Sequence, residues 1–127
     1  MPSVTPMTRV LFVSHDADLR AVATRVLVKA GCEVTAAAHA GHASLACAEP
    51  DAFDVLVIED RMPHGSAAEI VERVRRSCPA AQVVRMCDVT PAVASEGRAV
   101  VRPFTADDLI GAVSDATHYT RRFVASR

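Results

Sequence analysis

The feature that most constrains the fold of this chain is a regular alternation between short apolar runs and segments with helical periodicity. Residues 10–13 form a continuous run of β-forming apolar residues, which is typical of a strand covered on both faces in a parallel sheet. We expect strands at 10–13, 32–37, 55–59, 83–86 and 100–101. Strands that alternate with helices predict a doubly wound parallel sheet, because right-handed crossovers place helices on both of its faces.

The segments between these runs carry the helical signals. The helical periodicity runs over 19–30, with Asp16 and Asp18 at its N-terminal end, and we expect further helices at 41–49, from 67 to near Pro79, and from 105 to 119 or beyond. Gly31 supplies a left-handed cap for the first helix, and the segment from Thr105 to Asp108 resembles a capping box at the start of the last one.

The connection between the fourth and fifth predicted strands is short. Residues 88–101 must hold the crossover and most of a strand, close to the lower limit of roughly a dozen residues for a parallel connection. Thr90, Pro91 and Gly97 would suit a helix of about two turns. The fourth helix of the fold is therefore predicted to be shortened or missing.

The size and charge of the chain exclude several classes of protein. Its 127 residues suffice for one hydrophobic core, and we expect an N-terminal arm at 1–8, a folded domain at 9–119 and a basic tail at 120–127. A net charge of -1 lacks the basic footprint of a nucleic-acid-binding protein. With no signal peptide and no run of membrane-spanning length, we expect a cytoplasmic protein that does not contact membranes.

Four cysteines are scattered along the chain without the spacing of a zinc site or a disulfide framework. They are Cys32, Cys47, Cys78 and Cys87. We expect reduced thiols that bind no metal.

Polar residues end or follow four of the predicted strands, and the carboxyl ends of parallel strands form the usual ligand site of such a sheet. These residues are Ser14, His15 and Asp16, then Glu59, then Cys87, then Arg102, Pro103 and Phe104. Their order, together with the spacing of Glu59 and Pro63, resembles the receiver domain of response regulators. The resemblance implies a five-stranded flavodoxin-like sheet in the order 2-1-3-4-5. It also implies phosphoryl transfer from a histidine kinase to an Asp, with Mg²⁺ held by that Asp and an acidic pair.

The position of the phosphoacceptor in that family holds Glu59 here, four residues before Pro63. Asp60 is the alternative if the alignment shifts by one residue, although side chains alternate along a strand and Asp60 should point elsewhere. The longer Glu59 side chain would carry its carboxylate toward the phosphoryl position and imitate an activated state with less charge. A polar strand-end residue held in an ion pair is the other interpretation of Glu59.

Ser14 and His15 stand where the family has its acidic pair, and Asp16 follows one position later. Mg²⁺ requires oxygen ligands, usually carboxylates and water, so we expect neither Mg²⁺ nor another cofactor. Asp16 is interpreted as a helix cap. His15 has no partner at ligand spacing and is interpreted as structural or exposed rather than as a metal ligand.

The remaining positions of the family's site are altered as well. Cys87 replaces the switch Ser/Thr and Ala99 replaces its aromatic partner, and we interpret Cys87 as a small buried hydrophobe rather than a catalytic thiol. Arg102 stands at the position of the Lys and is predicted to pair with Glu59. The resemblance further implies a cis peptide bond before Pro103.

These observations predict a non-enzymatic pseudo-receiver domain in two-component signalling. It would bind a protein partner, such as a histidine kinase, without a phosphorylation cycle. Two alternatives stay open: a working phosphoacceptor that uses Asp60 or Glu59, and a flavodoxin-like protein that binds a nucleotide or anion. No Gly-rich phosphate loop supports the last of these. The sequence leaves open whether the chain is a standalone adaptor or part of a longer protein.

Overall fold

The computed structural model describes residues 7–62, 67–88, 98–101 and 104–125, and strands and helices alternate along them. In chain order the elements are β1 (Thr8–Val13), α1 (Ala17–Lys29), β2 (Cys32–Ala37), α2 (Ala40–Ala46), β3 (Val55–Glu59), α3 (Ala67–Ser77), β4 (Gln82–Cys87), β5 (Arg98–Val101) and α4 (Ala106–Ala125). The strands pair in parallel in the order β2-β1-β3-β4-β5. The predicted doubly wound, flavodoxin-like sheet is confirmed.

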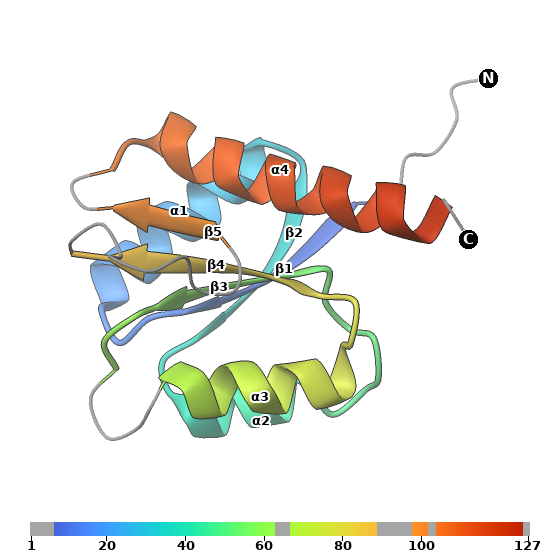
Figure 1. Cartoon of the computed structure of the whole chain (residues 1–127). Coiled ribbons are helices and arrows are strands. Elements are labelled where there is room, and N and C mark those ends of the chain that lie inside the picture. Colours follow the sequence, from blue (N-terminus) through green and yellow to red (C-terminus); the bar gives the residue numbers. More distant parts are fainter. Residues whose placement is uncertain (1–6, 63–66, 89–97, 102–103, 126–127) are drawn as a thin grey trace.

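Helices cover both faces of the sheet (Figure 1). α1 and α4 lie on one face, and α2 and α3 lie on the other. Along β1, Val10 and Phe12 pack into the core under α1 and α4, whereas Leu11 and Val13 pack into the core over α2 and α3. Because successive side chains of a strand point to opposite faces, a strand covered on both faces must be apolar throughout. This explains the continuous apolar runs in the sequence.

The central strand β3 is buried along its whole length, between β1 and β4. Its first four residues are apolar, and its last residue, Glu59, is only 2% exposed. The carboxylate of Glu59 is therefore buried away from bulk water at the edge of the sheet where the strands end.

Local capping explains where α1 begins and ends. The Asp16 side chain accepts hydrogen bonds from the backbone N–H groups of Asp18 (2.9 Å) and Leu19 (3.1 Å), which confirms the prediction that Asp16 is a helix cap. Gly31 has a φ of 99°, which confirms the left-handed cap at the other end.

The other helix ends differ from the sequence predictions in two places. α2 ends at Ala46, three residues before the predicted end at 49, because Cys47 leaves the helix as its C-cap and is buried in the core. α4 starts as predicted with a capping box, in which Thr105 and Asp108 exchange backbone-to-side-chain hydrogen bonds of 2.9 and 3.0 Å. It continues to Ala125, so residues 120–125 extend the helix rather than forming a separate tail.

The connection between β4 and β5 spans residues 88–97, and no helix is described in it. Four helices flank the five strands in the described part of the chain, and only ten residues join β4 to β5, in keeping with a shortened or missing fourth helix. The short helix predicted at 90–97 lies outside the described residues. None of the described helices is long and apolar enough to cross a membrane.

The four cysteines are buried, and none forms a disulfide. Burial raises the pKa of the Cys32 thiol. Burial also raises the pKa of the Cys47 thiol, and the neighbouring thiol of Cys78 adds to that rise. Cys32 and Cys47 are therefore held in the neutral, poorly nucleophilic form near pH 7.

Replacing Asp16 by Ala should lower the free energy of unfolding by about 1 kcal/mol, because two N–H groups of the first turn of α1 lose their acceptor. Urea denaturation measures the loss. The variant Asp16→Asn keeps an acceptor oxygen and should lose much less. Equal losses for both variants would show that the charge matters and the cap does not.

The free energy of unfolding should fall as the pH rises above the ordinary cysteine value of 9.0, because the pKa values of Cys32 and Cys47 are raised in the native state. Above that pH the unfolded chain releases thiol protons that the native chain still holds. Urea denaturation at neutral and alkaline pH measures the fall. A Cys32→Ala, Cys47→Ala double variant should lose less stability over the same range, and an unchanged pH dependence would contradict the assignment.

Candidate functional site

A shallow pocket of about 260 Å³ lies at the carboxyl ends of β1, β3 and β4. Its lining residues are His15, Glu59, Asp60, Arg61, Met86, Cys87 and Asp88. The fold thus brings together His15, Glu59 and Cys87, which the sequence placed at separate strand ends. Ser14, Asp16 and Ala99 do not belong to the lining.

The buried carboxylate of Glu59 is held by His15. Glu59 Oε2 lies 2.6 Å from His15 Nδ1 and accepts the backbone N–H of His15 at 3.1 Å. A carboxylate out of water needs such donors, because hydrogen bonds to a charged acceptor replace its lost hydration. The His15 side chain is 50% exposed, so one side of the ring meets Glu59 while the residue also reaches solvent.

The turn between β1 and α1 fixes the place of His15. Ser14 is fully buried, and its N–H donates to the carbonyl of Ala37 at 3.0 Å. Its hydroxyl oxygen accepts the N–H of Asp16 at 3.1 Å, and its carbonyl accepts Arg20 Nη1 at 2.7 Å. Because hydrogen bonds hold Ser14 and Asp16 on either side of it, His15 is kept facing the end of β3.

Asp60 lies at the rim of the pocket and forms an ion pair with Arg85, whose Nη1 is 3.1 Å from Asp60 Oδ1. Its backbone N–H continues the sheet by donating to the carbonyl of Met86 at 2.9 Å. Asp60 is about half exposed, whereas Glu59 is buried, so the two neighbouring carboxylates differ sharply in environment.

Arg85 is a site residue that the sequence reasoning missed. It interrupts the apolar strand β4, and its side chain is only 20% exposed. Its Nε atom is buried without a hydrogen-bond partner. A cation inside an otherwise apolar strand is the signal that could have identified it, because such a group requires a partner nearby.

Three side-chain oxygen atoms at this edge accept hydrogen bonds from backbone N–H groups. Glu59 Oε2 accepts from His15, the Asp16 carboxylate caps α1, and the Ser14 hydroxyl oxygen accepts from the backbone. Within the described ranges, no three His, Cys, Asp or Glu side chains form a group that could hold a metal ion. These residues do not fit the oxygen-rich, octahedral coordination that Mg²⁺ requires.

Of the remaining predicted positions, Cys87 lines the pocket, Ala99 and Phe104 lie apart from it, and two lie outside the described residues. Cys87 is 5% exposed, in keeping with a buried small hydrophobe. Ala99 is exposed and lines a different groove, between β5 and α4. Arg102 and Pro103 lie outside the described residues, so the ion pair and the cis bond stay predictions. Phe104 packs against the core under α1 and α4.

Comparison with known proteins gives a result at the level of structure. No family model matches the sequence, and no curated protein matches it significantly. The chemotaxis response regulator CheY4 of Vibrio cholerae superposes with a TM-score of 0.76 at 25% identity, over 87% of this chain and 99% of that one.

Two other solved structures are similar over even more of the chain. A response regulator receiver domain protein from Clostridium thermocellum has a TM-score of 0.79 at 18% identity, over 92% of this chain and 99% of its own. A structure described as an adenylate cyclase from Rhodopirellula baltica has a TM-score of 0.80 at 18% identity, over 95% of each chain. Since one similar structure is described as an enzyme, the fold by itself does not decide between signalling and catalysis. The chain has the CheY-like fold of response regulator receiver domains.

Proposed function

We propose that this chain is an atypical receiver domain that serves two-component signalling by binding a protein partner, without a cycle of phosphorylation. The receiver fold supports the signalling role. The hydrogen-bonded pair of Glu59 and His15 is the observation that supports the absence of a phosphorylation cycle.

A phosphorylation cycle needs a carboxylate oxygen that is free to attack and a cation that neutralises the developing charge. Glu59 occupies the acceptor position, but its Oε2 accepts the backbone N–H of His15 at 3.1 Å and lies 2.6 Å from His15 Nδ1. A phosphoryl group could be attached to Oε2 only if His15 moved away from that atom. The turn that carries His15 is anchored by Ser14, which opposes such a movement.

The donor atoms around Glu59 also argue against a magnesium cofactor. Ser14 and His15 stand where the receiver resemblance calls for two carboxylates, and a hydroxyl and an imidazole are poorer ligands for Mg²⁺. In this proposal His15 provides by hydrogen bonding part of the stabilisation that a bound cation would provide to the carboxylate.

The switch that follows phosphorylation in receiver domains is absent from the proposed mechanism as well. Cys87 offers a thiol, a weak hydrogen-bond donor, and Ala99 has no ring that could move. The domain would therefore present one constant surface to its partner, which we propose to be a histidine kinase or another signalling protein. No enzymatic step is part of this proposal.

Phosphorylation of Asp60 is the second candidate function. Asp60 lines the pocket and is about half exposed, so a phosphodonor could reach it more easily than Glu59. The ion pair with Arg85 counts against it, because the guanidinium occupies Oδ1 and stabilises the free carboxylate.

Incubation with acetyl phosphate and Mg²⁺, followed by intact-mass spectrometry, tests the proposal. The unmodified chain should gain no phosphoryl group. A His15→Asp, Glu59→Asp double variant restores an acidic residue and an Asp acceptor, and it should gain one, which controls for the reaction conditions. A labile phosphoryl group on the unmodified chain would overturn the proposal. Its loss in Asp60→Asn would assign the group to Asp60.

Replacing Glu59 by Ala should lower the free energy of unfolding by about 2 kcal/mol or more, because buried N–H groups lose a charged acceptor and a cavity forms. Glu59→Gln keeps the shape and one acceptor oxygen, so its loss should be clearly smaller. Urea denaturation of both variants measures the difference. A fully stable Glu59→Ala variant would show that the carboxylate has no structural part in the strand-end site.

A further inference from the structure

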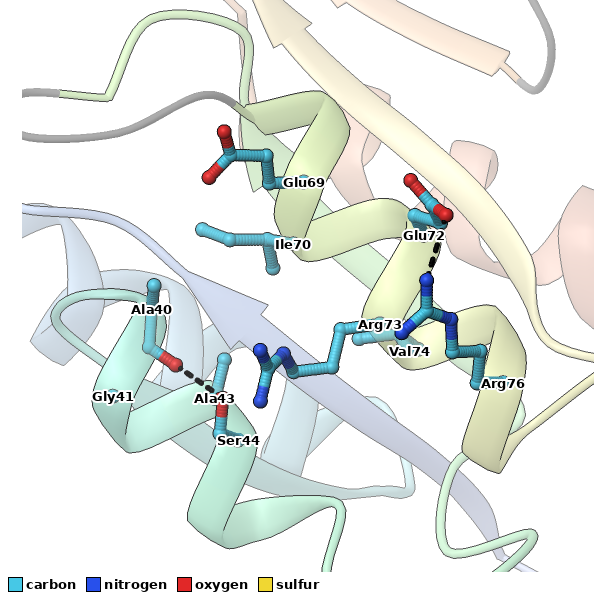
Figure 2. A pocket seen from close by; sticks show the side chains of 10 residues that line it. All are labelled: Ala40, Gly41, Ala43, Ser44, Glu69, Ile70, Glu72, Arg73, Val74 and Arg76. Carbon is cyan, nitrogen blue, oxygen red and sulfur yellow. Dashed lines mark hydrogen bonds and ion pairs between the residues drawn. The ribbon is translucent and has the colours of Figure 1, made fainter.

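A groove of about 460 Å³ runs between α2 and α3 and shares no lining residue with the strand-end pocket (Figure 2). Its apolar and small lining residues are Ala40, Gly41, Ala43 and Ser44 on α2 and Ile70 and Val74 on α3. The charged ones, all on α3, are Glu69, Glu72, Arg73 and Arg76. Small side chains on α2 let another chain approach its backbone closely.

The four charged side chains of the groove are not equivalent. Glu72 and Arg76 form an ion pair of 2.9 Å along α3. Glu69 and Arg73 have the same spacing, but neither forms an ion pair with any residue in the described part of the chain. Figure 2 shows the Arg73 guanidinium reaching across the groove toward α2, away from the Glu69 carboxylate. The groove therefore holds one unpaired acid and one unpaired base.

An exposed apolar side chain stands beside the groove. Leu45 on α2 is 76% exposed, more than any other large hydrophobic side chain of the described residues. It follows Gly41 by four positions, so the two lie one above the other on the same side of the helix. An exposed leucine next to a groove lined by small residues could pack into the same groove of another copy.

We infer that a second copy of this chain docks on this surface as a twofold-symmetric dimer. In such a dimer every contact occurs twice, so a surface must be complementary to itself. Glu69 of one copy would pair with Arg73 of the other, and the reverse pair would form by symmetry. Leu45 of each copy would pack over the small residues of the other groove. A purely acidic or purely basic partner would satisfy only one of the two charges.

This inference does not depend on how the strand-end site functions, and the oligomeric state tests it directly. The chain has a mass of 13.5 kDa. Sedimentation equilibrium from about 10 μM to about 1 mM covers the range expected for a small, reversible interface, and the mass should rise toward that of a dimer. A chain that stays monomeric throughout overturns the inference.

Charge reversal locates the interface. Glu69→Arg and Arg73→Glu should each raise the dimer dissociation constant about tenfold or more, because each places two like-charged pairs across the twofold axis. Both positions are exposed, and circular dichroism verifies that the variants fold. Arg25→Glu is the matched control: Arg25 is exposed on α1, over the other face of the sheet, and its reversal should leave the dissociation constant unchanged.

Mixing the two variants gives the sharpest test. In a dimer of Glu69→Arg with Arg73→Glu, both cross-axis pairs again join opposite charges, so the mixture should dimerise at least as well as the unmodified chain. Failure of the mixture to associate, or a dimer that both reversals leave unchanged, overturns the assignment to this surface. Binding of a glutamate-rich helical peptide to a monomeric chain through Arg73 would assign the groove to a different partner and would also overturn it.

Discussion

The buried carboxylate of Glu59, at the end of the central strand, is the constraint on which the strand-end site depends. Taking a carboxylate out of water costs several kcal/mol unless hydrogen-bond donors replace the water. His15 supplies its backbone N–H and brings Nδ1 to 2.6 Å from the carboxylate, and a hydrogen bond between Ser14 and Arg20 holds the turn that carries His15. Several polar groups at this edge therefore hydrogen-bond to one another, and the burial of the Glu59 carboxylate depends on these contacts.

Much of the sheet could be predicted because the neighbouring strands β1 and β3 are buried on both faces and so leave continuous apolar runs in the sequence. The bounds of β2 and β3 match their predicted ranges, since each run ends where polar or small residues begin. Helix ends were harder to predict. The end of α2 depends on the burial of Cys47 against α3, and nothing in the local sequence reports that contact.

The site could be predicted only where it depends on residues that are close together in the sequence. The Asp16 cap and the placement of Glu59 at a strand end follow from neighbouring residues. The contact of His15 with Glu59 joins residues 44 positions apart, and that of Asp60 with Arg85 joins residues 25 positions apart. Such pairs depend on how the strands stack in space, so a pattern along the chain does not specify them.

The short strand at one edge of the sheet has a consequence for recognition. β5 has four residues and stands beside β4 at the end of the strand order. A short edge strand offers few unpaired backbone N–H and C=O groups, which disfavours the edge-to-edge strand pairing that leads to fibrils. It equally discourages a peptide ligand from binding as an extra strand. Specificity on this side of the sheet would then reside in helix side chains, where single substitutions can change the partner without disturbing the backbone.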